Sequence, residues 1–250
     1  MLRSSARWNG QQLEPEKYRL LARRRDLKPF RITDGETDML LFGTDVFFEE
    51  AARFIHEARE QVGKYIGEHP SFQKSLVPVP DDDDAPPVVR DMIRAGKKAE
   101  VGPMAAVAGA VAQYTGRRLL GLSPEIAAEN GGDVFFRTDH PRRFGIVAES
   151  AGNPLVHIEV AETVPGAGKG VCTSSGRLGH SMNFGRADAV TVIAEDAALA
   201  DALATAASNR IQSRKNIRPT MEWTLERGAE GIVIMAFEQI AAMGSVHFSG

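Results

Sequence analysis

The second half of the chain carries a series of short strand candidates whose connections are too short for crossover helices. The spacer AGNP at 151–154 suits an antiparallel hairpin, whereas parallel strands need a connection of about a dozen or more residues. Strands grouped together, with helices beside them, predict an α+β fold with antiparallel sheets and packed helices. The strand candidates are Asp133–Arg137, Phe144–Glu149, Leu155–Val160, Gly170–Thr173 and Ala189–Ala194, with further strands at 39–42, 231–237 and 245–248.

Helical patterns occupy three other regions, and one stretch interrupts them. Residues 45–58 have apolar side chains at helical spacing, 102–120 is rich in small residues, and 196–209 is almost entirely alanine. The stretch LVPVPDDDDAPP at 76–87 contains four prolines and four adjacent aspartates, which favour an extended, solvated loop. We therefore expect one domain over 1–250, in which this loop separates two halves of similar architecture.

Composition excludes several classes of protein. The 250 residues include 30 Lys and Arg against 33 Asp and Glu, a net charge of -3 that argues against binding nucleic acid through the whole chain. A single cysteine excludes an internal disulfide. The first 25 residues are too polar for a signal peptide, and the longest strongly apolar stretch, 104–112, is too short to span a membrane. We expect a cytoplasmic protein without nucleic-acid or membrane partners.

A glycine pair marks the first candidate site. In ENGGDVFF, Gly131 and Gly132 precede Asp133 at the start of a predicted strand. Glycine allows a ligand to approach the backbone closely, exposed N–H groups in such a turn can bind phosphate, and the carboxylate can accept hydrogen bonds from a ring or ribose. A plain hairpin turn is an equally good interpretation of this motif.

The second candidate is VCTSSGRLGH, at the end of another predicted strand. Thr173, Ser174 and Ser175 supply three adjacent hydroxyls. These hydroxyls could hold a ligand, or one serine could be a nucleophile. Cys172 could also be a nucleophile with His180 as its base, although a lone cysteine in a strand is more often a small buried hydrophobe.

The third candidate lies on the alanine-rich helix. Asp196 is placed to cap its N-terminus. Asp201 and Thr205 are four residues apart and share one face, where a carboxylate and a hydroxyl suit a hard cation such as Mg²⁺. Alternatively, Thr205 bonds to its own helix and Asp201 lies in solvent. Alanines surround Asp201, so the helix should pack closely, and a buried carboxylate there needs a partner.

Taken in order, these motifs resemble the FAD:protein FMN transferase (ApbE) family, once linked to thiamine biosynthesis. The motifs are NGGD (130–133), CTSSG (172–176), His180, DAVTVIA (188–194) and ADALAT (200–205), and the resemblance is greatest to a cytoplasmic ApbE-like branch over about 101–210. It implies a fold related to the tunnelling fold (T-fold) with internally duplicated halves. It also implies a small-molecule nucleotide ligand, FAD, in a cleft lined by Gly131, Gly132, Asp133, Thr173, Ser174 and Ser175, and Mg²⁺ held by Asp201 and Thr205. By analogy with T-fold relatives, a homodimer is a further expectation.

The chain also departs from this family. The histidine element, usually H-I-x-D-P-x-T-G, is shortened to HSMNFG at 180–185. We therefore keep two hypotheses: a Mg²⁺-dependent flavin transferase or FAD pyrophosphatase with His180 as a catalytic residue, or a non-catalytic protein that binds a flavin- or pterin-type nucleotide. A third is an interaction protein that acts through its basic residues 1–31.

Overall fold

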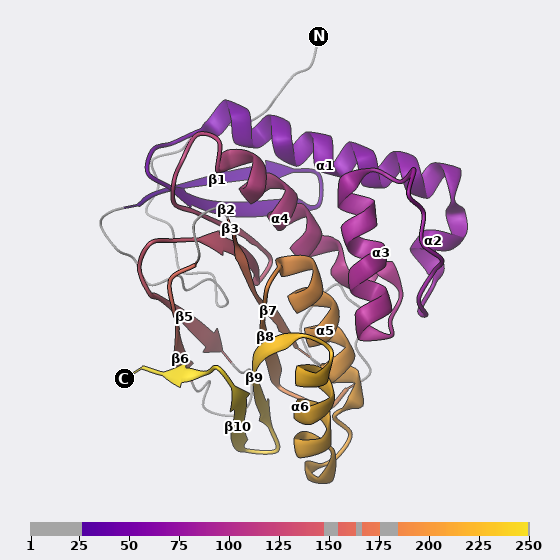
Figure 1. The fold of residues 1–250 in the computed structure, drawn as a ribbon, viewed down its shortest axis with the longest axis vertical. Helices are drawn as coiled ribbons and strands as arrows, with labels where there is room; N and C mark the ends of the chain where they lie inside the picture. Colours follow the sequence, from indigo (N-terminus) through magenta and orange to yellow (C-terminus); the bar gives the residue numbers. More distant parts are fainter. Residues whose placement is uncertain (1–26, 148–154, 164–166, 176–184, 250) are drawn as a thin grey trace.

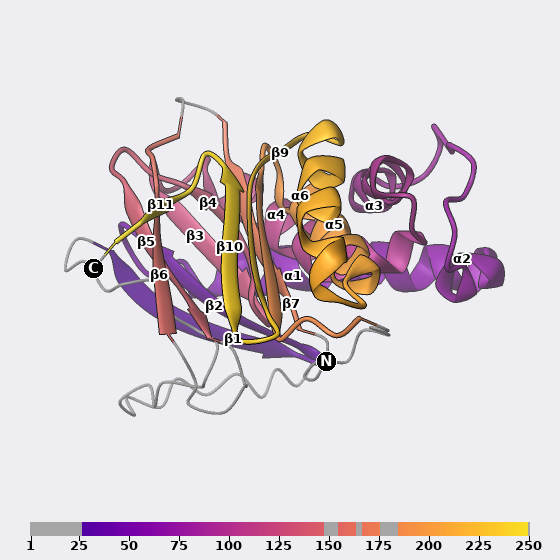
Figure 2. The ribbon, with the colours of Figure 1, turned by 90° about the horizontal axis from the view of Figure 1, so that it is seen from below.

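An eight-stranded antiparallel sheet forms the centre of the molecule, with helices on one face and a small three-stranded sheet on the other (Figures 1 and 2). The computed structural model describes residues 27–147, 155–163, 167–175 and 185–249. Two apolar cores result, one between the large sheet and the helices and one between the two sheets. This architecture is the predicted α+β fold.

The large sheet consists of two groups of four strands. Its order is β1-β2-β3-β4-β7-β8-β9-β10, and all neighbours are antiparallel. The strands are β1 (Lys28–Asp34), β2 (Thr37–Gly43), β3 (Ile126–Asn130), β4 (Asp133–Arg137), β7 (Lys169–Ser174), β8 (Ala189–Ala194), β9 (Ala229–Ala236) and β10 (Gln239–Gly244). Each group has a hairpin, then helices, then a second hairpin, which is the expected internal duplication.

The helices cover one face of this sheet in chain order. Helix α4 packs on β3 and β4, α5 on β7 and β8, and α6 on β9 and β10, while α1 lies against α4 and β1. The helices are α1 (Phe48–Glu68), α2 (Pro70–Lys74), α3 (Pro87–Ala99), α4 (Val107–Leu119), α5 (Ala197–Arg210) and α6 (Ile217–Glu226), with 3₁₀ turns at Pro103–Ala106 and Arg214–Asn216.

The acidic, proline-rich stretch at 76–87 does not separate the two halves. It joins α2 to α3 and therefore lies inside the first half, whereas the two groups of strands meet where β4 pairs with β7. Proline also has a different role at its end, because Pro87 is the first residue of α3, a position that needs no backbone N–H donor. The expected boundary between repeats is thus corrected from 76–87 to the β4–β7 pair.

The three-stranded sheet comes from the connection between β4 and β7 and from the C-terminus. It consists of β5 (Arg142–Val147), β6 (Leu155–Val160) and β11 (His247–Phe248), in the order β11-β6-β5. Phe144, Ile146 and Ile158 from this sheet pack against Phe136 and Val171 of the large sheet. The strand predicted at Phe144–Glu149 is confirmed through Val147, and its last two residues lie outside the described ranges.

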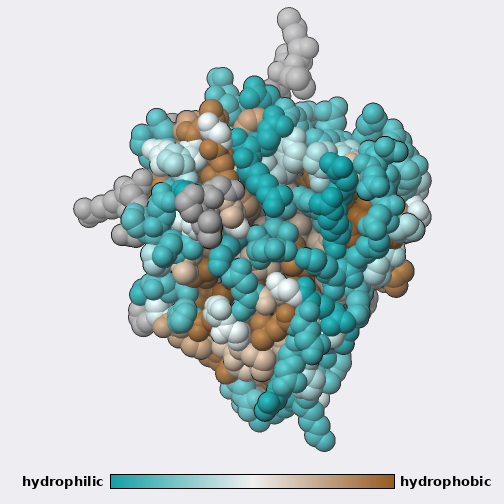
Figure 3. All heavy atoms as spheres, in the orientation of Figure 1, coloured by the Kyte–Doolittle hydropathy of each residue, from teal (hydrophilic) through white to brown (hydrophobic). Residues whose placement is uncertain are grey.

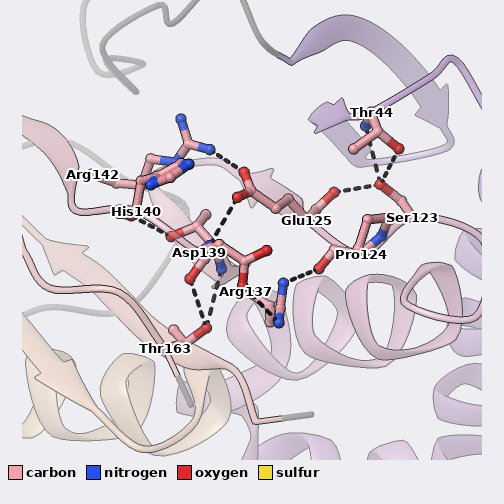
Figure 4. Close-up of polar contacts among 10 residues, drawn as sticks. Thr44, Ser123, Pro124, Glu125, Arg137, Asp139, His140, Arg142 and Thr163 are labelled. Atoms are coloured by element: carbon pink, nitrogen blue, oxygen red, sulfur yellow. Dashed lines mark hydrogen bonds and ion pairs between the residues drawn. The ribbon is translucent and has the colours of Figure 1, made fainter. Parts of the chain in front are cut away.

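A buried ionic network joins the two sheets at the end of β4 (Figure 4). Glu125 is bonded to the guanidinium of Arg142, and its other oxygen accepts a 2.9 Å hydrogen bond from the Asp139 backbone N–H. Arg137 pairs with Asp139 at 2.9 Å and donates to the Pro124 carbonyl. The Thr163 hydroxyl accepts a 3.1 Å hydrogen bond from the Thr138 backbone N–H. This bond joins the start and the end of the β5–β6 excursion, the segment 138–163 that leaves the large sheet after β4.

The described residues include no helix that is long and apolar enough to cross a membrane.

Candidate functional site

The turn between β3 and β4 is built by its two glycines. Asn130 pairs with Asp133 across the hairpin, and between them Gly131 and Gly132 have φ values of +65° and +104°. Positive φ at both central residues is typical of a type I′ turn, which glycine adopts without strain. A side chain at Gly131 would meet no atom within 4 Å, and one at Gly132 would meet only the Thr173 carbonyl, at 3.9 Å. The turn is therefore open on its outer side, beside the end of β7.

The hydroxyls at the end of β7 lie next to this turn. Asp133 pairs with Cys172 in the β4–β7 register, so the residues after Cys172 extend alongside the glycine pair. The hydroxyls of Thr173 and Thr191 are 2.8 Å apart, and the Ser175 hydroxyl donates to the Asp188 carbonyl at 3.0 Å. Two of the three predicted elements, the turn and the strand end, thus form one continuous polar edge.

Helix α5 brings the third element against this edge. As predicted, Asp196 caps the helix, accepting from the Leu199 N–H at 2.7 Å. The buried amide of Gln113, on α4, accepts from the Ala197 N–H at 2.8 Å and so satisfies another free donor at the helix start. Residues 197–208 of α5 are all buried, so this helix lies inside the protein rather than on its surface.

Asp201 has the partner that its buried position requires. Its Oδ2 accepts a 2.9 Å hydrogen bond from the backbone N–H of Gly109, at the start of α4. A Cβ at Gly109 would overlap the Ala197 carbonyl oxygen and lie 2.8 Å from the Cβ of Asp201. The glycine therefore allows α4 and α5 to approach closely enough for the bond. The alternative in which Asp201 lies in solvent is wrong, since this residue is only 8% exposed and Thr205 only 6%.

Two carboxylates share the buried side of the site. Burial raises the pKa of Asp133 well above its ordinary value, and the nearby charge of Asp201 raises it further. Burial also raises the pKa of Asp201, to about 7, against the opposing effect of hydrogen bonds from the Gly109 and Ala108 backbones. Among the described residues, neither carboxylate forms an ion pair with a lysine, arginine or histidine. A bound cation would relieve their mutual repulsion.

Cys172 lies beside Asp133, its partner in the β4–β7 register. Its side chain is fully buried, and its thiol donates to the Ala197 carbonyl at 3.3 Å. Burial raises the pKa of the thiol well above its ordinary value, and the charges of Asp133 and Asp201 raise it further. Because the thiolate is the nucleophile, these surroundings make Cys172 inert and favour the interpretation of a small buried hydrophobe.

The donor chemistry of the site fits a hard cation. Carboxylate, hydroxyl and backbone carbonyl oxygens are the ligands that Mg²⁺ prefers, and Asp201 and Thr205 supply the first two. In the part of the chain that the structure describes, no group of three or more His, Cys, Asp or Glu is arranged to hold a metal. Asp201 and Thr205 would thus need ligand oxygens from the bound substrate, water or the backbone.

The structure brings Asp133 and Asp201 close together beside the glycine turn, and Thr205 is buried one turn further along α5. The Thr173 hydroxyl, bonded to Thr191, lies on the opposite face of the sheet from Cys172 and α5. His180 lies outside the described residues.

Sequence reasoning did not assign Gln113 to the site. The sequence carries little indication of a buried role for Gln113, because a glutamine in a helix of small residues is usually exposed. Asn130 was also missed as a contact, although its side chain donates to the Ala108 carbonyl at 3.2 Å and ties the turn to the start of α4.

Comparison with known proteins gives one family. A family model described as AbpE bacteria matches residues 19–226. A UPF0280 protein of Methanocaldococcus jannaschii is 38% identical over 226 residues, covering 86% of this chain and 90% of its own length. A UPF0280 protein of Methanothermobacter thermautotrophicus is 36% identical over 228 residues, covering 86% and 85%.

Solved structures share the fold at low sequence identity. The ApbE protein of Thermotoga maritima aligns with a TM-score of 0.55 at 15% identity, over 89% of this chain and 97% of its own. The flavinyl transferase ApbE of Pseudomonas stutzeri aligns with a TM-score of 0.56 at 14% identity, over 87% and 93%. At these identities the likeness is one of fold, and it confirms the ApbE-like arrangement expected from the motifs.

Proposed function

We propose that this chain, which belongs to the family described as AbpE bacteria, binds FAD or a related flavin nucleotide together with Mg²⁺. It would then cleave the pyrophosphate bond of that nucleotide. The observation that carries this proposal is the pair of buried carboxylates, Asp133 and Asp201, at the junction of the glycine turn and the β7 end, which have no cationic partner among the described residues. The Pseudomonas stutzeri protein that shares this fold is a flavinyl transferase, which supports flavin as the ligand class.

Each part of the site has a role in this proposal. Asp201 and Thr205 would hold Mg²⁺, which supplies charge neutralisation at the pyrophosphate and polarises the bond to be cut. The open turn at Gly131 and Gly132 lets phosphate oxygens approach the backbone. Ser174, which lies on the same face of β7 as Cys172, would contact the same oxygens through its hydroxyl.

The reaction would be a phosphoryl transfer. An acceptor hydroxyl attacks the phosphorus next to the flavin, the bond from that phosphorus to the bridging oxygen breaks, and AMP leaves. The hydroxyl proton passes to a base, for which His180 remains the candidate. With a protein hydroxyl as acceptor the product is flavinylated protein, and with water it is FMN.

Titration calorimetry with FAD, with and without Mg²⁺, tests the binding. Wild type should bind FAD more tightly with Mg²⁺ than with EDTA, and Asp201→Asn should abolish that difference. Glu195→Gln is the matched control, because it removes an exposed carboxylate just before α5 that forms an ion pair with Lys98. Equal affinity with Mg²⁺ and EDTA, or unchanged Mg²⁺ dependence in Asp201→Asn, contradicts the proposal.

The second candidate function is non-catalytic nucleotide binding, which the shortened element HSMNFG at 180–185 favours. Chromatographic measurement of AMP during incubation with FAD and Mg²⁺ separates the two functions. Release of AMP that is lost in Asp201→Asn supports catalysis. Mg²⁺-dependent binding without AMP, with or without an added acceptor protein, supports the binding function.

A further inference from the structure

The two edges of the large sheet differ in how they are protected. Strands β1 and β10 are the outermost strands, and within the described ranges no strand pairs with the outer edge of either. A bare edge presents a row of free N–H and C=O groups that invite pairing with another strand. Proteins usually guard such edges with charged residues or proline.

Strand β1 carries this protection and β10 does not. The sequence of β1, KPFRITD, contains Lys28, Pro29, Arg31 and Asp34. Pro29 has no N–H to donate, and the charges oppose a dry contact. The sequence of β10, QIAAMG, has no charged residue and no proline along its whole length. The β10 edge is therefore open to pairing in a way that the β1 edge is not.

After Gln239, the side chains of β10 are apolar on both faces of the sheet. Ala241 and Met243 contact the core beneath the helices. Ile240 lies opposite Met235 of β9 and so faces the side of the sheet on which Met235 is buried, yet Ile240 is 49% exposed. Figure 3 shows apolar side chains among polar ones in the lower part of the face that Figure 1 draws, where β9 and β10 lie. The apolar layer thus reaches the edge without being covered there.

We propose that β10 pairs with β10 of a second copy of this chain, antiparallel about a two-fold axis, so that the two large sheets become continuous. At a two-fold interface each residue near the axis faces itself or a close neighbour in the other copy. A charge there would meet a like charge, which is destabilising in directly opposed strands. An uncharged strand such as β10 meets this requirement, whereas β1, with Lys28 and Arg31, does not.

Light scattering coupled to size-exclusion chromatography tests this dimer with the full chain. Wild type should have the mass of a dimer at micromolar concentration, and Ile240→Lys should have the mass of a monomer. The control is Thr33→Lys, which places the same charge at an exposed position on the β1 edge and should remain a dimer. A monomeric wild type overturns the proposal, also where other residues of the same chain cover the β10 edge. A dimeric Ile240→Lys variant overturns it too.

A crosslinking experiment keeps the proposal testable if Ile240→Lys does not fold. Ala242 is exposed on β10, so Ala242→Cys should form an intermolecular disulfide under mild oxidation, seen as a dimer on a non-reducing gel. Thr33→Cys should stay monomeric on the same gel, and the native Cys172 is buried and should not contribute. Equal crosslinking of the two variants contradicts pairing through β10.

Discussion

At the scale of single residues, the buried carboxylate of Asp201 should make the stability of the protein depend on pH. Burial raises its pKa from 3.8 to about 7, so between these values the folded state holds a proton that the unfolded state has released. The free energy of unfolding must therefore fall as pH rises from about 4 to about 7, by up to about 1.4 kcal/mol per pH unit for one proton. The raised pKa of Asp133 acts in the same direction.

Urea denaturation of the metal-free protein between pH 4 and pH 8 measures this slope. Asp201→Asn should flatten it, because the asparagine cannot ionise, while Glu195→Gln should leave it unchanged. Parallel curves for wild type and Asp201→Asn would show that the Asp201 pKa is not raised on folding.

Gly109 provides a second prediction at this scale. Gly109→Ala should destabilise the protein by about 1–3 kcal/mol, because the new methyl group would overlap the Ala197 carbonyl and push α4 away from α5. Gly63→Ala on α1 is the matched control. Its methyl would meet nothing within 4 Å, and the gain in helix propensity should stabilise the protein by about 0.5–1 kcal/mol. Similar changes in thermal midpoint for the two variants would contradict the close packing at Gly109.

At the scale of elements, the attachment of the β5–β6 excursion depends on the buried Glu125–Arg142 pair. Arg142→Met should cost about 3–5 kcal/mol in the free energy of unfolding, because it leaves Glu125 buried without its cation. Arg218→Met removes a cation from an exposed pair with Glu222 and should change stability by less than about 1 kcal/mol. If urea denaturation gives both variants a small effect, Glu125 must be hydrated in the native state.

Elements with a regular apolar pattern were predictable from the sequence, and those without one were not. Ala189–Ala194 and Asp133–Arg137 were predicted with their observed bounds because β-branched or aromatic residues fill them. Strand β3, with the sequence IAAEN, has only one such residue, Ile126, and pairing with β2 and β4 overrides its weak propensity. Helix α6 was not predicted; it contains Pro219, which is tolerated in its first turn.

The candidate site was predictable because its parts are local motifs. The glycine turn, the hydroxyl cluster and the Asp201–Thr205 spacing can each be recognised within a few residues. Their convergence depends on the β4–β7 pairing and on the packing of α4 against α5, which are long-range contacts. The small residues of 102–120 include Gly109, where the backbone of α5 approaches α4 closely.

At the scale of the whole molecule, the site lies where the two halves of the sheet meet. Strand β4 closes the first group of four strands and β7 opens the second, and the candidate site takes Asp133 from one and Ser174 from the other. Helix α5 of the second half is held to α4 of the first through the Asp201–Gly109 bond. Loss of either half should therefore remove the site as a unit, and ligand binding should stabilise both halves together.

The single cysteine offers a direct measure of this coupling. Cys172 is fully buried between β4, β8 and α5, so a thiol reagent should reach it only when the junction of the two halves opens. Labelling of the native protein should be slow and should accelerate with urea as steeply as global unfolding does, because local fraying cannot expose this position. The double variant Cys172→Ala, Thr33→Cys, with its thiol at an exposed site, should react at once without urea. Fast labelling of native wild type, or labelling that urea does not accelerate, would mean that the junction opens without unfolding the rest.

FAD with Mg²⁺ should slow the reaction of Cys172 in proportion to the stabilisation it provides, and should leave the Thr33→Cys rate unchanged.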